Sequence, residues 1–426
     1  MLDRKQAPSF NKIDSIFIAQ AKREQLDNGI EVYSIDSGSQ ELVKIEFNFK
    51  AGTYYQSHKM QAGHTGNMME NGTKNYSAEQ ISEHLDYYGS YYETSVALDN
   101  AYIALFSLNK HLQDSIVYAE EIIKNASFPQ HEYDIFLKNA KQQFLVNQKK
   151  VSVIAKNEFA ELIFGANHPY NNKVALQDFD LIDRNHLLNF YNTHYQHGNC
   201  SVIISGKLPE NYLQLLNVHF GNNKWGEFHK IKSQSVEMHA TRERKNFIHK
   251  DDALQSAIRI GRSLFNKRHP DYFKFQVLNT VLGGYFGSRL MSNIREDKGY
   301  TYGIGSGLVS LIHGGYFAIS TEVGADVTQN ALDEIYYEIK RLREELIPEE
   351  ELEIVKNYIL GVFLRSIEGP FSLAEKFKSI WEFGLDYDYY NRYVEAVKNC
   401  TAPELMELAN KYLKEEDLIE LVVGKK

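Results

Sequence analysis

The sequence predicts an α+β protein with two similar halves, each an antiparallel β-sheet backed by helices. Three observations support this prediction. The chain has 426 residues, of which 43% are hydrophobic, and this length suits two or three domains. One order of elements (a strand, two short helices, two strands and two long helices) occurs twice along the chain. A polar, charged segment with little apolar periodicity, residues 221–246, separates the two copies.

The first copy is defined by its apolar runs and by the residues that end them. Ser77 and Gln80 form a capping box that predicts a helix start, and Gly89 predicts the end of that helix. Asp99 and Asn100 suit a tight hairpin turn between two strands. The expected strand, short helix, second helix and strand pair fall at 42–51, 63–70, 77–89, 91–98 and 101–108. Two long helices complete the unit.

The second copy repeats this order. Its strand, two helices and strand pair are expected at 256–263, 272–282, 289–298, 300–309 and 315–323. Pro129 and Pro348 both precede a long helix whose first turn carries acidic residues, a favourable helix start. We therefore predict an N-terminal domain at 1–220, a linker at 221–246 and a C-terminal domain at 247–426.

Composition excludes several classes of function. A formal charge of -9 and a pI near 6.0 disfavour a nucleic-acid binder, which needs a basic face for phosphates. Cys200 and Cys400 are far apart and form no Cys-x-x-Cys pattern, so neither a disulfide framework nor a cysteine zinc site is indicated. The first residues lack a secretory signal pattern, and no apolar run is long enough to span a bilayer. We expect a cytoplasmic protein without membrane contact.

Three segments stand out, residues 62–73, 168–170 and 282–302. They resemble the insulinase/pitrilysin family of zinc peptidases, which includes the mitochondrial processing peptidases. The third segment is the most specific, because it combines loop, helix and strand onset in the order that the family uses. The resemblance covers most of the chain and implies paired homologous domains in a clam-shell arrangement.

The resemblance fails at the metal motif. Active members carry an inverted motif, His-x-x-Glu-His, shortly before a Gly-Thr pair, and its histidines and glutamate bind zinc and activate water. The stretch 135–157, where the family places a further glutamate ligand, contains no Asp or Glu. His64 has no second histidine three or four residues away. Counted back from Gly72 and Thr73, the five motif positions are Gly63, His64, Thr65, Gly66 and Asn67. We expect no metal in this chain.

The second half retains a different signature of the family. Its members bind substrate with an arginine and a tyrosine seven residues apart, and Arg295 and Tyr302 match that spacing. The tyrosine hydroxyl suits oxyanion stabilisation, and the arginine offers a fixed charge and several donors. Alternatively, neither residue binds substrate: Arg295 forms an ordinary surface ion pair, and Tyr302 is one aromatic side chain of a buried strand. The resemblance also implies that the backbone at Gly283, Gly284 and Gly287 lies close to a bound peptide.

The resemblance thus implies the non-metal-binding subunit of a heterodimeric zinc peptidase. This chain would supply Arg295 and Tyr302 in trans for peptide hydrolysis, and a homologous partner with an intact His-x-x-Glu-His would hold the zinc. Two alternatives stay open: an inactive structural or assembly homologue, and an autonomous peptidase with unusual ligands. The peptide substrate, the partner's identity and homodimer formation by the isolated chain also stay open.

Overall fold

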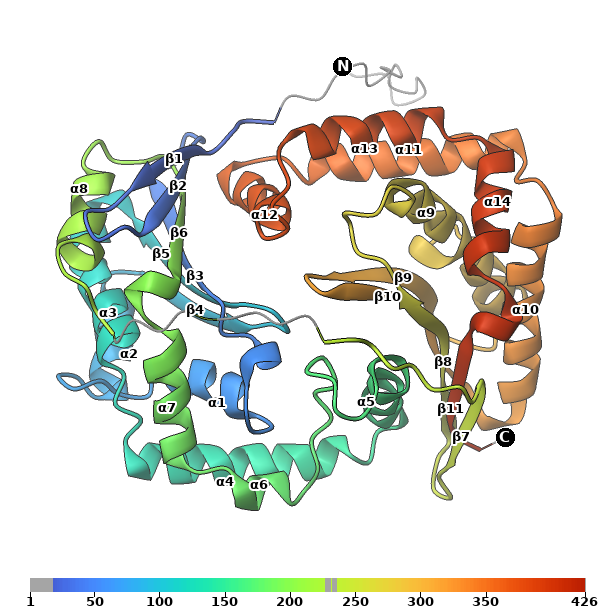
Figure 1. Ribbon diagram of the computed structural model, residues 1–426, viewed down its shortest axis with the longest axis horizontal. Helices are drawn as coiled ribbons and strands as arrows, with labels where there is room; N and C mark the ends of the chain where they lie inside the picture. The colour runs from blue at the N-terminus through green and yellow to red at the C-terminus, as the bar shows by residue number, and fades with distance from the viewer. Residues whose placement is uncertain (1–17, 227–230, 232–235, 426) are drawn as a thin grey trace, which may run out of the picture.

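The computed structural model describes residues 18–226, 231 and 236–425. Its described part contains two sheets, one in each half of the chain (Figure 1). The strands of the first sheet are β1 (Lys22–Gln25), β2 (Glu31–Asp36), β3 (Leu42–Phe49), β4 (Tyr91–Val96), β5 (Ala101–Leu108) and β6 (Cys200–Gly206). The strands of the second are β7 (Lys245–His249), β8 (Gln255–Leu264), β9 (Ile304–Leu311), β10 (Gly314–Gly324) and β11 (Ile419–Gly424).

The two sheets share one topology, which confirms the α+β fold with two similar halves. The strand order is β1-β2-β6-β3-β5-β4 in the first sheet and β7-β11-β8-β10-β9 in the second. Each sheet is antiparallel except for one parallel pair, β2 with β6 and β7 with β11. The last strand of each half lies inside its sheet, β6 between β2 and β3 and β11 between β7 and β8. The two neighbours of this strand run in opposite directions, so it must run parallel to one of them.

Helices cover both sheets. In the first half they are α1 (Gln61–Met68), α2 (Ala78–Tyr87), α3 (Leu112–Asn125), α4 (Gln130–Asn147), α5 (Val151–Phe164), α6 (Asp178–Leu181), α7 (Arg184–His194) and α8 (Tyr212–Leu216). In the second half they are α9 (Tyr272–Asn279), α10 (Thr328–Glu344), α11 (Glu349–Arg365), α12 (Pro370–Trp381), α13 (Asp388–Asn399) and α14 (Ala402–Tyr412), with π-helical turns at Thr280–Gly284 and Met291–Asp297. The Ser77 capping box is present, and Pro129 and Pro348 are the N-caps of α4 and α11, as predicted.

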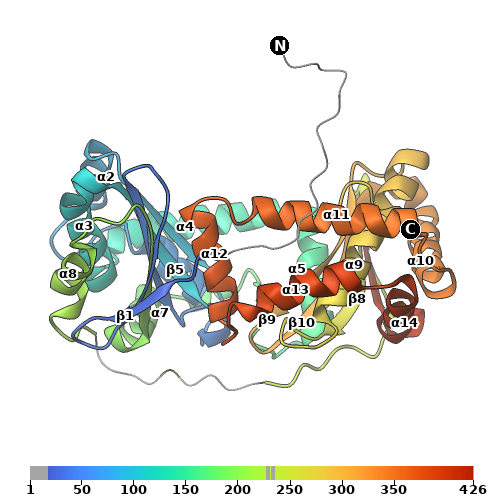
Figure 2. The ribbon, with the colours of Figure 1, turned by 90° about the horizontal axis from the view of Figure 1, so that it is seen from above.

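The halves exchange one helix each. Helix α5 packs on β8 and β11 of the second sheet, whereas α12 packs on β2 and β6 of the first. Phe159 and Ile163 of α5 share a buried cluster with Leu421 of β11. Phe377 of α12 packs against Tyr33 of β2, with ring centroids 4.9 Å apart. Figures 1 and 2 show both helices beside the sheet of the opposite half. The predicted domain boundaries stay a prediction, and neither half is closed without the other's helix.

Three buried charges and the half-exposed Glu375 join α12 to the first sheet. Lys44 of β3 lies 2.7 Å from Glu46 and 2.8 Å from Glu375 of α12. Lys378 of α12 lies 3.0 Å from Glu46 and 2.8 Å from Glu375. Burial alone would lower the pKa of Lys44, but Glu46 and Glu375 raise it above its ordinary value. The two lysines and two carboxylates therefore form one mutually compensated cluster.

A second contact between the halves forms at hairpin turns. The Asp99 carboxylate, in the predicted turn between β4 and β5, accepts hydrogen bonds from the Tyr170 hydroxyl (2.6 Å) and the Ile312 amide (3.1 Å). The His313 amide donates to the Tyr170 hydroxyl (3.1 Å). Ile312 and His313 form the turn between β9 and β10. One buried tyrosine therefore holds the hairpin turns of the two sheets together.

Helix α1 lies close to the edge strand β4 because Gly66 has no side chain. A Cβ atom at Gly66 would lie 2.4 Å from Val96 Cγ2, which is closer than carbon atoms pack. A Cβ atom at Gly63, on the same helix, would meet nothing within 4 Å. Only one of the two helix glycines is therefore required by packing.

The strand expected at 300–309 begins later than predicted, at Ile304. Gly299 adopts φ +67, a left-handed conformation that ends the preceding turn. The Thr301 hydroxyl donates to the Glu322 carbonyl (2.7 Å), and the Gly303 amide donates to the Thr301 hydroxyl (3.1 Å). This local hydrogen bonding holds residues 299–303 as a loop, so Tyr300 and Tyr302 both lie before the strand.

The predicted linker is only partly described, because residues 227–230 and 232–235 lie outside the described residues. Farther along, the His239 and Thr241 amides donate to the Phe164 and Leu162 carbonyls (3.1 and 2.8 Å). The end of the linker thus follows α5. Among the described residues, no helix has both the length and the apolarity that crossing a membrane requires.

The charge cluster predicts a large effect for one substitution. Glu46→Gln removes the carboxylate shared by Lys44 and Lys378, so we expect the free energy of unfolding to fall by about 3–5 kcal/mol. Chemical denaturation followed by circular dichroism measures it. The control is Asp180→Asn, whose partner Lys141 is exposed, and it is expected to cost about 1 kcal/mol or less. If both variants lose equally little unfolding free energy, the four charges do not form a mutually compensated cluster.

The two glycines of α1 should respond oppositely to alanine. Gly66→Ala forces Val96 or the helix to move, and overpacking of this kind costs about 1–3 kcal/mol. Gly63→Ala enters open space in a helix and should stabilise by about 0.5–1 kcal/mol. Thermal unfolding of both variants measures the difference. A higher unfolding temperature for Gly66→Ala would show that α1 and β4 are not tightly packed.

Candidate functional site

The residues at the metal-motif positions lie on α1, and His64 is the only imidazole among them. Its ring meets Phe136 edge-on, with centroids 4.9 Å apart, and Phe179 lies 6.4 Å away. The buried His64 Nδ1 atom has no hydrogen-bond partner. Burial lowers the pKa of His64 to about 4, so the ring is neutral near pH 7. His64 therefore packs as an aromatic side chain.

The other motif positions do not fit zinc, which is the metal that the resemblance implies. The position of the base glutamate is Gly66, where Val96 occupies the space that a side chain needs. The positions of the two ligand histidines are Gly63 and the exposed Asn67. Glycine has no side-chain donor, and an asparagine oxygen is a poor substitute for the nitrogen and sulfur ligands of zinc. None of these three residues can supply the missing ligands.

The facing helix α4 supplies no replacement. A shallow hollow of about 370 Å³ lies between Asn71 and the first turns of α4. Its α4 side is formed by Phe136, Asn139, Ala140 and Gln143, with Glu132 as its one carboxylate. Across the part of the chain that the structure describes, no three His, Cys, Asp or Glu side chains gather where they could hold a metal ion.

The histidine pair His194 and His197 also has a structural explanation. The His194 Nδ1 atom lies 2.8 Å from the Lys50 carbonyl, and the His197 Nδ1 atom lies 2.6 Å from the Trp225 carbonyl. Both side chains are buried. They therefore anchor the backbone after α7 to neighbouring segments.

Arg295 lies on the π-helical turn Met291–Asp297. Its guanidinium carbon is 4.6 Å from the centroid of the Phe286 ring, a cation–π contact. The nearest Glu296 oxygen is 4.0 Å away, which is too far for a hydrogen bond. The Arg295 side chain is 34% exposed, so most of its donors stay available to a ligand.

Tyr302 is the most exposed large aromatic side chain of the described residues, at 95%. Thr301, the residue before it, is tied to β10 through the Glu322 carbonyl. Tyr302 lines a hollow of about 410 Å³ together with Ser152 of α5 and Arg259 of β8. Tyr300, by contrast, packs against the second core. The two tyrosines therefore have different environments: Tyr300 packs against the core, and Tyr302 is exposed to solvent.

The three predicted glycines have different surroundings. Gly283 is buried, and a Cβ atom there would lie 2.7 Å from the Ser306 amide, so packing against β9 requires a glycine. Gly284 lines one pocket and Gly287 lines another. Phe286, between them, carries the contact to Arg295. The structure thus joins Arg295 to this segment, whereas Tyr302 lies at a separate hollow.

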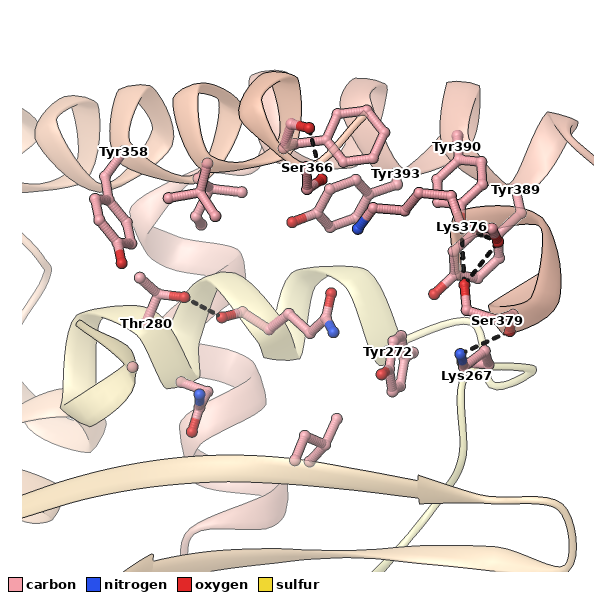
Figure 3. A pocket seen from close by; sticks show the side chains of 17 residues that line it. Lys267, Tyr272, Thr280, Tyr358, Ser366, Lys376, Ser379, Tyr389, Tyr390 and Tyr393 are labelled. Carbon is pink, nitrogen blue, oxygen red and sulfur yellow. Dashed lines mark hydrogen bonds between the residues drawn. The ribbon is translucent and has the colours of Figure 1, made fainter. Parts of the chain in front are cut away.

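Sequence reasoning missed a pocket of about 460 Å³ between α9, α11, α13 and β9 (Figure 3). Lys267 and Lys376 reach it, and tyrosines form much of its wall. Its only sequence signal is the density of tyrosine near its C-terminal wall, where Tyr387, Tyr389, Tyr390 and Tyr393 fall close together. Gly284 also lines this pocket, which places it beside the segment expected to lie near substrate.

Comparisons with known proteins agree with this fold. Residues 181–359 match the family described as "Peptidase M16 inactive domain". An "Uncharacterized zinc protease" of Rickettsia bellii is 23% identical over 407 residues, which cover 91% of this chain and 93% of that protein.

Two solved structures share the fold over nearly the whole chain. A structure from Pseudomonas fluorescens, described as a peptidase M16 inactive domain, has a TM-score of 0.85 at 19% identity and covers 96% of this chain and 98% of its own. A structure described as a protease from Helicobacter pylori has a TM-score of 0.87 at 17% identity, and the match covers 96% of this chain and 100% of that one. At these identities the two structures show the fold alone.

The repeated strand order, the motif segments and the family match over residues 181–359 agree with one another, and the relative covers 91% of this chain. The resemblance to the insulinase-like peptidases is therefore confirmed: residues 181–359 match the M16 inactive-domain family, and a relative described as a zinc protease is similar to the chain over most of its length.

Proposed function

We propose that this chain is the zinc-free subunit of a two-chain M16 peptidase and that it supplies Arg295 and Tyr302 for substrate binding. The partner is a homologous chain with an intact His-x-x-Glu-His on the helix that corresponds to α1. Peptides or unfolded segments are the substrates. Zinc belongs to the partner in this proposal, and the present chain is inactive when alone.

The observation that carries the proposal is the environment of α1. A peptidase of this family needs two imidazoles and two carboxylates around its metal. Here the base position is Gly66, which is closed by Val96, and His64 lies among aromatic rings. Restoring the site would require changing several residues and moving β4. These surroundings support the proposal that this chain does not bind the zinc.

The second support is the presentation of Tyr302. Its side chain is 95% exposed, yet Thr301 fixes the loop that carries it. An exposed aromatic on a fixed loop loses little conformational entropy when it meets a ligand. A tyrosine hydroxyl can donate a hydrogen bond to a carbonyl oxygen that gains negative charge during hydrolysis. Arg295, only weakly paired with Glu296, can donate to neighbouring peptide carbonyls.

An assembly role without catalysis is the second candidate. The family match is described as an inactive domain, whereas the Rickettsia relative is described as a zinc protease. A purely structural subunit would need neither Tyr302 nor Arg295 for the activity of its complex. The two functions therefore separate in experiments on the assembled pair.

The metal content of the isolated chain tests the first part of the proposal. After dialysis against zinc-containing and then zinc-free buffer, we expect far fewer than one zinc per chain by elemental mass spectrometry. The ligand set at α1 is absent, so no tight site should exist. A homologous chain with the intact motif serves as the positive control. Stoichiometric zinc together with peptidase activity in the isolated protein would establish an autonomous enzyme instead.

Tyr302→Phe tests the catalytic contribution. In the pair with the motif-bearing partner, we expect kcat for peptide cleavage to fall about 100-fold or more, as for loss of an oxyanion donor. Assembly, measured by light scattering after gel filtration, should be unchanged because Tyr302 is exposed.

The matched control is Tyr300→Phe, in the same loop. Tyr300 packs against the second core, so removal of its hydroxyl should leave kcat near the wild-type value. If Tyr302→Phe also retains full activity within an intact pair, the assembly role is the correct one.

A further inference from the structure

The pocket between α9, α11, α13 and β9 differs in charge from the rest of the molecule. The chain carries 56 acidic and 47 basic residues. The 17 residues that line this pocket nevertheless include two lysines and no Asp or Glu (Figure 3). An uncompensated positive charge in a partly closed space attracts anions, because the surrounding protein screens the charge less than water does.

Lys376 is the principal cation of the pocket. Its amine lies 5.5 Å from the centroid of the Phe363 ring and forms no ion pair within the described residues. Burial lowers the pKa of Lys376 below its ordinary value. In Figure 3 its side chain extends along the pocket toward Tyr393. The neighbouring Glu375 on α12 is engaged elsewhere, with Lys44 and Lys378.

Lys267 adds a second cation, beside the α12 wall of the pocket (Figure 3). Its amine donates to the Ser379 carbonyl (2.8 Å) and lies 4.5 Å from the centroid of the Phe383 ring. Burial lowers the pKa of Lys267 to about 8; the Glu382 carboxylate opposes this shift, and the charge of Lys376 adds to it. Both lysines are thus held at a cost in free energy that a bound anion would offset.

Hydroxyl groups supply further donors. The Tyr390 hydroxyl is already bonded to the Lys376 carbonyl (2.7 Å). The hydroxyls of Tyr389 and Tyr393 make no hydrogen bond to the described residues, and both side chains line the pocket. A lysine amine with neighbouring tyrosine hydroxyls matches the several lone pairs of a carboxylate.

The remaining walls are apolar. Leu308, Ile359 and Val362 line the pocket, and the rings of Tyr358 and Phe363 add aromatic surface. The volume of about 460 Å³ falls within the range of small-ligand sites. A wholly hydrophilic anion would leave these walls without contact, so the ligand needs an apolar body as well as a charge.

We propose that this pocket binds a carboxylate carried on an aliphatic or aromatic body, with Lys376 as the main cation and Tyr393 as a hydrogen-bond donor. Two sources present this group: a free organic acid and the C-terminal residue of a peptide. The inference does not depend on the peptidase role, because the pocket lies within the second half and needs no partner chain.

Calorimetric titration of the full chain tests the proposal with defined probes. The probes are N-acetyl-phenylalanine, a hexapeptide ending in phenylalanine, the C-terminal amides of both, and inorganic phosphate. We expect each acid to bind at least about tenfold more tightly than its amide, as for loss of one charge-assisted interaction. Binding of the small acid alone identifies a free acid as the ligand, and tighter binding of the hexapeptide identifies a peptide terminus. Equal affinity for acids and amides, or binding of phosphate only, would overturn the proposal.

Substitutions locate the binding. Lys376→Met keeps the apolar stem and removes an unpaired, half-buried charge, so the protein should unfold at an equal or higher temperature and bind the acid about tenfold more weakly. Tyr393→Phe removes only a hydroxyl and should weaken binding about two- to tenfold. The control is Lys340→Met on α10, where the lysine side chain is 65% exposed and outside the pocket. Acid binding that survives Lys376→Met and Tyr393→Phe unchanged would place the site elsewhere.

Discussion

The exchange of α5 and α12 between the two sheets is the constraint on which the rest of the structure depends. Each helix covers a sheet whose strands belong to the opposite half, so each core is completed by a helix of the other half. The cluster of Lys44, Glu46 and their α12 partners makes one of these contacts specific, since only the matched charges can be buried without a large penalty. The bond between Asp99 and Tyr170 then joins the hairpin turns of the two sheets. Residues far apart in sequence are thereby held in one rigid arrangement.

The two halves have similar strand orders but differ in the environments of their polar residues. In the first half, α1 approaches β4 so closely that Gly66 cannot carry a side chain, and His64 is absorbed into aromatic packing. That helix contributes to stability. In the second half, the loop after the π-helical turn Met291–Asp297 exposes Tyr302 to solvent. Arg295 lies over the Phe286 ring, and its N–H donors can reach a ligand. The polar groups available for a ligand are therefore concentrated in the second half, and the pocket around Lys376 adds to them.

Much of the fold was predictable because local signals were strong. The capping box at Ser77, the prolines that precede α4 and α11, and the alternating apolar runs each determine an element from its own residues. The strand that begins at Ile304 was predicted to begin at residue 300. Thr301 donates a hydrogen bond to the Glu322 carbonyl of another strand, and this bond holds the residues before Ile304 as a loop. The parallel strand pairs were also missed, because strand order within a sheet is set by contacts between elements that are distant in sequence.

The sequence by itself determined the repeated α+β architecture and the absence of a zinc motif, since periodicity, caps and missing ligand types are properties of the residues themselves. Only the tertiary structure decided that Gly66 is closed by Val96, that Tyr300 is packed while Tyr302 is exposed, and that Lys267 and Lys376 meet in one pocket without a carboxylate. These features arise from close approach between segments that are separate along the chain. Their free energies depend on burial and on neighbours, which a linear pattern does not encode.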